Sequence, residues 1–167
     1  VPDDPEAVII AAPHTSNWDA VWAIAYKLVV GLDVRWFAKH SAFWFPLGNI
    51  LRAFGAIDLN REKAGTAVNE AIRLFDEKDS FYFALAPEGT RKRTSGWKTG
   101  FYRIATGANV PVYLGFIDFT KRRIGIGPGI HLSGDVEVDL AVIRKFYAGI
   151  EGRWPEKASP IEFRDYS

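Results

Sequence analysis

The chain has 167 residues, a length that suits a single globular domain, residues 1–167, with a core of its own. Its 48% apolar and 25% charged residues argue against a disordered chain and a polytopic membrane protein. The net charge of +1 provides no sequence-wide basic field for nucleic acid, and the lack of cysteine excludes disulfides, thiolate catalysis and cysteine metal sites.

Strands and helices are expected to alternate along the chain. The expected elements, in order, are a buried strand at 7–13, a helix at 18–30 stopped by Gly31, a strand at 34–39, a short helix within 43–54, a short strand at 55–60, a helix at 63–76, a buried strand at 80–87, a helix within 98–108, a strand at 110–118, short strands and turns at 122–134, and a final helix at 138–150. This alternation predicts an α/β domain with a mostly parallel central sheet flanked by helices on both faces.

Polar side chains are expected to gather where parallel strands end. Ligands of such sheets bind at the carboxyl ends of the strands. Five candidates fall at these ends, namely His14, Asn60, Arg61, Glu88 and Arg91.

The stretch "HTSNWD" places His14 five residues before Asp19, between an expected strand and an expected helix. Ser16 and Asp19 have the spacing of a capping box, in which case Asp19 only opens the helix. A histidine on the turn, backed by a carboxylate one turn later, is also the arrangement of a general base with an orienting acceptor. Both interpretations fit the local pattern.

Two further loops carry polar residues to the same expected edge. "APEGTRKR" at 86–93 follows a buried strand, and "GAIDLNRE" at 55–62 brings Arg61 just past another. Singly, the first is explained by a surface turn with a solvated charge run, and the second by an exposed arginine at a helix start. Together with His14, they place one histidine and two arginine-bearing loops at one sheet edge.

Four motifs in order then resemble the PlsC-type family of glycerolphosphate and lysophospholipid acyltransferases. They are "HTSNWD", "GAIDLNR" with Lys39 and "PLG" before it, an intact "PEGTR", and "VPV" at 110–112, over about residues 9–117. The chain departs from the family after "VPV", where "YLG" stands in place of a second proline.

The resemblance implies transfer of a fatty acyl group from an acyl thioester, acyl-CoA or acyl-carrier protein, to a hydroxyl of a lysophospholipid-type acceptor such as lysophosphatidate. It implies that His14 is the general base and that Asp19 orients it, with no metal and no cofactor beyond the donor. The substrate-binding residues expected from it are Arg61 and Arg91 for the acceptor phosphate, Lys39 and Lys98 as further cations, and Glu88, Gly89 and Thr90 on the second loop.

Because both expected substrates carry long chains, the enzyme is expected to act at a membrane surface. Its expected location is the cytoplasm, peripheral at the cytoplasmic membrane face. The aromatic stretch from Trp36 to Phe54 is the candidate membrane contact, and core packing is the alternative explanation for it. The chain starts at Val1 without any methionine, which is compatible with a further N-terminal anchor or signal. Two other functions stay open, a hydrolase or thioesterase on the same fold and a non-catalytic module that binds anionic lipid.

Overall fold

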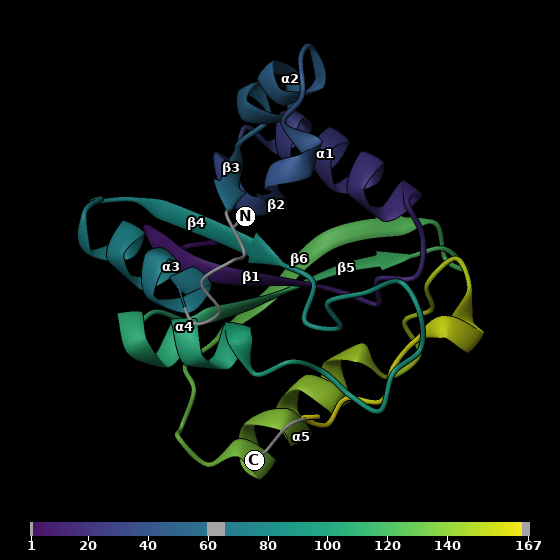
Figure 1. The fold of residues 1–167 in the computed structure, drawn as a ribbon. Helices are drawn as coiled ribbons and strands as arrows, with labels where there is room; N and C mark the ends of the chain where they lie inside the picture. Colours follow the sequence, from purple (N-terminus) through teal and green to yellow (C-terminus); the bar gives the residue numbers. More distant parts are fainter. Residues whose placement is uncertain (1, 60–65, 165–167) are drawn as a thin grey trace.

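The computed structural model describes residues 2–59 and 66–164, in which a six-stranded sheet carries helices on both faces (Figure 1). The strands are β1 (Glu6–Ala12), β2 (Val34–Lys39), β3 (Ala56–Leu59), β4 (Phe81–Leu85), β5 (Val112–Asp118) and β6 (Arg123–Ile130). The helices are α1 (Trp18–Val30), α2 (Leu47–Ala53), α3 (Thr66–Asp76), α4 (Gly100–Ala108) and α5 (Val136–Tyr147), with short 3₁₀ helices at His40–Ala42 and Pro155–Lys157. The predicted single α/β domain is confirmed.

The sheet is mixed, with strand order β3-β2-β4-β1-β5-β6. All neighbouring pairs are parallel except β5 and β6, so the predicted mostly parallel sheet is also confirmed. The expectation of short strands and turns at 122–134 was wrong, because β6 is one strand of eight residues. The alternating glycines of this stretch favoured turns in the prediction. In the structure they belong to the strand, where Gly127 leaves room for the ring of Phe146 and Gly129 for the ring of Tyr113.

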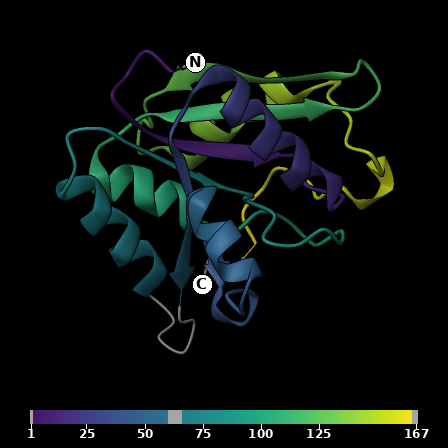
Figure 2. The same ribbon diagram turned by 90° about the horizontal axis from the view of Figure 1, so that it is seen from above.

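The two faces of the sheet are covered unequally. Helices α3, α4 and α5 bury the main core on one face, around Phe83, Phe101 and Leu114. A smaller cluster on the opposite face includes Ile9 and Val34, and Figure 2 shows α1 lying over the sheet there. Asp19 is the one residue of α1 that is buried, and most of the apolar surface of this helix remains exposed.

Lys27 ties α1 to the far part of the sheet. Its ammonium group donates hydrogen bonds to the carbonyl oxygens of Val34 at 2.9 Å and Phe54 at 2.8 Å. Burial lowers the pKa of Lys27, the opposite of the effect of the nearby Asp33 carboxylate. The charge that interrupts the apolar run of α1 therefore joins this helix to β2 and to the end of α2.

Asp139 makes the start of α5 sensitive to acid. Burial alone would raise the pKa of Asp139, but hydrogen bonds donated by Ser133 and Tyr102 hold it below its ordinary value. The native state thus binds this proton more weakly than the unfolded chain. Its contribution to stability is present above the unfolded pKa and is lost as the pH falls through the lower native pKa.

We therefore expect Asp139→Asn to lower the free energy of unfolding at pH 7 by about 1–3 kcal/mol, because buried donors lose a charged acceptor. The variant should also show a weaker loss of stability below pH ~4 than the parent. Urea denaturation between pH 3 and pH 7 measures both. If the free energy of unfolding falls equally steeply in acid for the parent and the variant, Asp139 is not the cause of the acid sensitivity.

Candidate active site

Three segments meet at the carboxyl edge of the parallel strands. The turn at 13–17 joins β1 to α1, the loop at 86–99 joins β4 to α4, and the segment at 149–160 follows α5. Since β1 and β4 pair directly, the turn and the loop leave the sheet side by side. Hydrogen bonds link both of them to the C-terminal segment.

The turn brings His14 and Asp19 into contact. His14 Nδ1 lies 3.1 Å from Asp19 Oδ2, with the histidine side chain 24% exposed and the aspartate side chain 6% exposed. A carboxylate only accepts, so this pairing assigns the proton to Nδ1 and leaves Nε2 as the basic nitrogen. Among the described residues Nε2 has no hydrogen-bond partner, and it is free to receive a proton from a bound molecule.

The same aspartate oxygen also organises the start of α1. Oδ2 accepts the backbone N–H groups of Thr15 at 2.8 Å and Ser16 at 2.9 Å. Ser16 Oγ accepts from the Trp18 N–H and not from Asp19, and the N-cap residue is Asn17, so the predicted capping box is formed on the aspartate side only. One oxygen therefore both caps the helix and faces the imidazole, and the two interpretations of Asp19 hold together.

Glu88 joins the histidine to the C-terminal segment. It is 1% exposed, and its two carboxylate oxygens accept the backbone N–H of His14 at 2.6 Å and that of Ser159 at 3.1 Å. Burial raises the pKa of Tyr147 well above its usual range, and the negative charge of Glu88 adds to this effect. Both carboxylate oxygens of Glu88 therefore bind backbone N–H groups around the dyad.

The rest of the "PEGTR" loop turns back on itself before it reaches the surface. Gly89 has a φ of +66°, and a Cβ at this position would lie 2.9 Å from Cε of Lys98, whose chain crosses over it. Thr90 Oγ1 accepts the Lys92 N–H at 3.3 Å, which stabilises the turn locally. Arg91 is exposed and points into the pocket next to the turn.

Two further cations, Lys39 and Arg61, were predicted for the site. Lys39 is exposed at the end of β2, and β4 separates β2 from β1. Arg61 lies outside the described residues, and the strand before it, β3, is separated from β1 by β2 and β4. In the described part of the chain, no group of three or more His, Asp or Glu side chains is placed to hold a metal ion.

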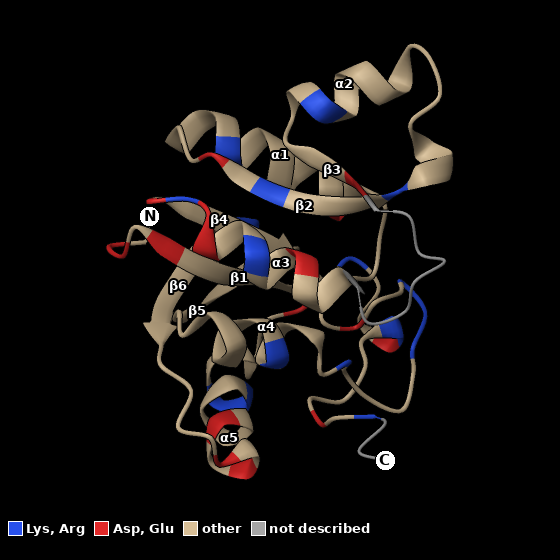
Figure 3. Ribbon diagram, turned by 60° about the vertical axis from the view of Figure 1, so that its left-hand side comes forward, with Lys and Arg blue, Asp and Glu red and all other residues tan. Residues whose placement is uncertain are grey.

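A pocket of about 440 Å³ opens next to the turn at 13–17, with Thr15, the neighbour of His14, in its lining. Figure 3 shows Lys and Arg gathered on the loops at this side of the molecule. The C-terminal part of this lining was not predicted, because nothing in "RWPEK" indicates that these residues fold back onto a turn near the start of the chain. The pocket is lined by Thr15, Ser16, Asn17, Trp18, Arg91, Lys92, Arg153, Trp154 and Lys157.

The structure is therefore an α/β domain with a histidine–carboxylate pair and basic loops at the carboxyl edge of its parallel strands, the edge where sheets of this kind bind their ligands. A family model described as Acyltransferase matches residues 2–114, which include the turn, the "PEGTR" loop and β5 as far as Leu114. The chain belongs to this acyltransferase family, as its resemblance to PlsC-type enzymes predicted. Comparisons with curated proteins and with solved structures give no match.

Proposed function

We propose that this acyltransferase moves a fatty acyl group from an acyl thioester to a hydroxyl of a lysophospholipid-type acceptor. The observation that carries the proposal is the pairing of His14 Nδ1 with Asp19 Oδ2 at 3.1 Å. It leaves Nε2 without a partner among the described residues, on the turn whose next residues, Thr15 and Ser16, line the cationic pocket. Nε2 takes the proton of the acceptor hydroxyl as its oxygen attacks the thioester carbonyl. The carbon–sulfur bond then breaks, and the leaving thiolate takes the proton from the imidazolium. Asp19 stabilises that imidazolium in between.

The acceptor phosphate is assigned to the loop after β4. Arg91 lines the pocket, and a guanidinium group pairs with two phosphate oxygens at once. Lysophosphatidate is therefore the acceptor we propose, with Lys98 of the same loop as a further cation. Lys39 stands apart from the dyad, and Arg61 lies outside the described residues. Gly89, which allows the Lys98 chain to lie close, and Thr90 keep the loop in this shape.

A thiol-release assay tests the reaction. We expect acyl-CoA or acyl-carrier protein to release thiol only when lysophosphatidate is present, with no requirement for a divalent ion. Release that does not need an acceptor would establish a thioesterase instead, and dependence on a divalent ion would favour a hydrolase that uses a metal. If the protein binds anionic lipid but releases no thiol, it is the non-catalytic lipid-binding module and not an enzyme.

We further propose that the enzyme works in the cytoplasm, peripheral at the cytoplasmic membrane face. Within the described residues no helix is long and apolar enough to cross a bilayer. Trp44 is 61% and Phe45 is 82% exposed, so this part of the aromatic stretch supports an interfacial contact. Phe37 is instead half-buried against Phe83, with ring centroids 4.7 Å apart, as the core interpretation required.

The membrane contact extends to a surface that the sequence analysis did not include. Helices α1 and α2 lie on the same side of the sheet (Figures 1 and 3). Helix α1 exposes large apolar side chains along its length, and it has few polar ones to face water. The sequence already contained a sign of this surface, because the helix "WDAVWAIAYKLVV" is apolar on nearly all sides. The large apolar side chains that α1 exposes are Trp18, Val21, Trp22, Leu28 and Val29.

We expect the double variant Trp44→Ser, Phe45→Ser to bind anionic liposomes at least tenfold more weakly, because both side chains leave water when the protein docks. Liposome co-sedimentation measures the binding, and thermal unfolding checks the fold. Val138→Ser, Val142→Ser on the distant helix α5 is a matched control that also removes two exposed apolar side chains. Equal liposome binding by the Trp44, Phe45 variant and the parent would remove this contact.

A further inference from the structure

The C-terminal segment that follows α5 adds two cations to the pocket beside the dyad. Arg153 and Lys157 come from this segment, whereas Arg91 and Lys92 come from the loop after β4. The described lining of the pocket thus holds four cationic side chains and no carboxylate. The segment lies wholly beyond residues 2–114, the part of the chain that the family model covers.

The segment is held over the turn at two points. The backbone N–H of Trp154 donates to Thr15 Oγ1 at 3.2 Å, and that of Ser159 donates to Glu88 Oε2 at 3.1 Å. Just before the first of them the chain fits closely against the turn, because a Cβ at Gly152 would lie 2.6 Å from Thr15 Oγ1. Arg153 and Lys157 are therefore placed by backbone contacts to the same residues that hold His14.

Both cations of the segment rest on indole rings and not on acids. The guanidinium carbon of Arg153 lies 5.8 Å from the ring centroids of both Trp18 and Trp154, and Lys157 Nζ lies 5.3 Å from that of Trp154. A ring face positions a cation without using its N–H donors. In the described part of the chain none of the four cations has an ion-pair partner, so their donors remain available to an oxygen ligand.

We propose that Arg153 and Lys157, together with Arg91 and Lys92, form a subsite for a phosphoryl group of a substrate. A carboxylate carries one charge and would leave most of this cluster uncompensated, whereas a phosphate monoester carries about two and a nucleotide donor more. Two guanidinium groups with two ammonium groups match several phosphate oxygens. The subsite rests on the acyl transfer proposed above, and its phosphoryl group belongs to the acceptor headgroup or to the coenzyme A part of the donor.

Calorimetric titration with coenzyme A and with glycerol 3-phosphate tests the subsite apart from turnover. We expect one of them to bind the parent protein, more weakly as salt is raised. The double variant Arg153→Gln, Lys157→Gln should raise its dissociation constant by about tenfold or more, as expected for lost charge-assisted hydrogen bonds. Binding of glycerol 3-phosphate identifies the acceptor as the source of the phosphate, in agreement with the role proposed for Arg91. Binding of coenzyme A identifies the donor instead and removes that role of Arg91.

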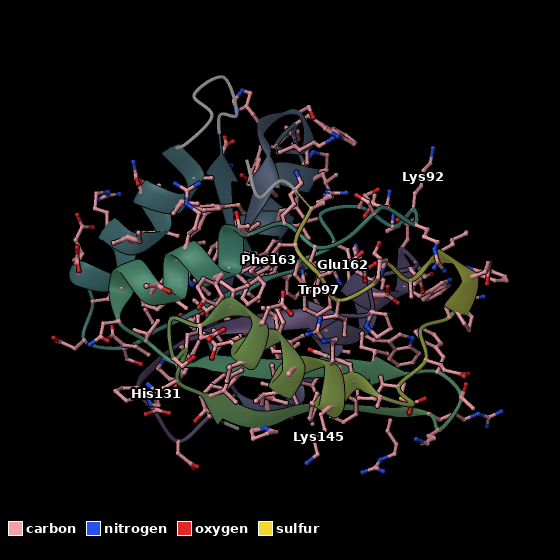
Figure 4. The ribbon with its side chains drawn as sticks, turned by 90° about the horizontal axis from the view of Figure 1, so that it is seen from below. Lys92, Trp97, His131, Lys145, Glu162 and Phe163 are labelled. Atoms are coloured by element: carbon pink, nitrogen blue, oxygen red, sulfur yellow. The ribbon has the colours of Figure 1, made fainter. Side chains whose placement is uncertain are left out.

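A matched control removes the same two charges elsewhere. Arg103 and Lys145 are exposed and do not line the pocket, and Figure 4 shows Lys145 on α5, away from Lys92. Arg103→Gln, Lys145→Gln should leave the dissociation constant within about twofold of the parent value, because exposed charges beyond a Debye length are screened. An equal loss of affinity in both double variants would mean a diffuse charge effect and would overturn the subsite.

The subsite and the reaction fail separately. Failure of both probes to bind the parent, or binding that the Arg153, Lys157 double variant leaves unchanged, would overturn the subsite even if thiol release occurs. Binding that weakens as expected, in a protein that releases no thiol from any pair of substrates, would retain the subsite and reject the acyl transfer.

Discussion

Replacement of His14 by alanine should nearly abolish acyl transfer. A positioned general base contributes about 10² to 10⁴ in rate. The other imidazole–carboxylate pair of the described residues, His40 with Asp58, lies at β2 and β3, and β4 separates both strands from β1. The fold should survive, because Asp19 Oδ2 keeps the backbone N–H groups of Thr15 and Ser16. The measurement is kcat for thiol release with lysophosphatidate, beside the free energy of unfolding.

A matched histidine variant separates this effect from general damage. His131 is exposed and follows the antiparallel strand β6, so it lies at the opposite edge of the sheet (Figure 4). His131→Ala should retain the parent kcat. If His14→Ala keeps its kcat within a few-fold of the parent while remaining folded, His14 is not the base and the proposed mechanism is wrong.

Replacement of Glu88 by alanine should reduce both stability and turnover. The change leaves two backbone N–H groups, of His14 and Ser159, without the acceptor that they have now. A buried donor without a partner costs about 1–3 kcal/mol, so the free energy of unfolding should fall by about 2–6 kcal/mol. Turnover should fall as well, because the backbone N–H of His14 loses the acceptor that ties it to Ser159 of the C-terminal segment. Urea denaturation and kcat measure the two effects.

Glu88→Gln and a surface variant make this prediction specific. The glutamine keeps one carbonyl oxygen but turns an amide group toward the second N–H, so an intermediate loss of stability is expected. Glu162 is exposed just after the C-terminal segment (Figure 4), and Glu162→Gln should leave the free energy of unfolding within about 0.5 kcal/mol of the parent value. A Glu88→Ala protein as stable as the parent would show that the carboxylate does not support the site.

Much of the fold follows from local patterns in the chain. The expected helix at 18–30 and the expected strand at 34–39 match α1 and β2 residue for residue, because apolar periodicity and Gly31, with a φ of +69°, act over a few neighbouring residues. The dyad is equally local. His14 and Asp19 are five residues apart, and the turn before a helix is enough to bring them together.

The parts that were missed depend on contacts between distant segments. The sequence of α1 is apolar on nearly all sides, and which of these sides stays exposed follows from how the helix packs on the second face of the sheet. Lys39 and Arg91 both end or follow strands, yet the strand order puts β4 between β2 and β1, so Arg91 reaches the pocket and Lys39 stays apart.

The sequence alone therefore determined the α/β class, the order of the elements, the family and the His14–Asp19 pair, since each rests on residues that are near neighbours in the chain. Tertiary structure alone decided how the site is completed. Glu88 bonds to a backbone 74 residues before it and to another 71 residues after it, and Trp154 bonds to Thr15 across 139 residues. Such pairs are chosen by the packing of the whole sheet, which brings the end of the chain over the turn where it began.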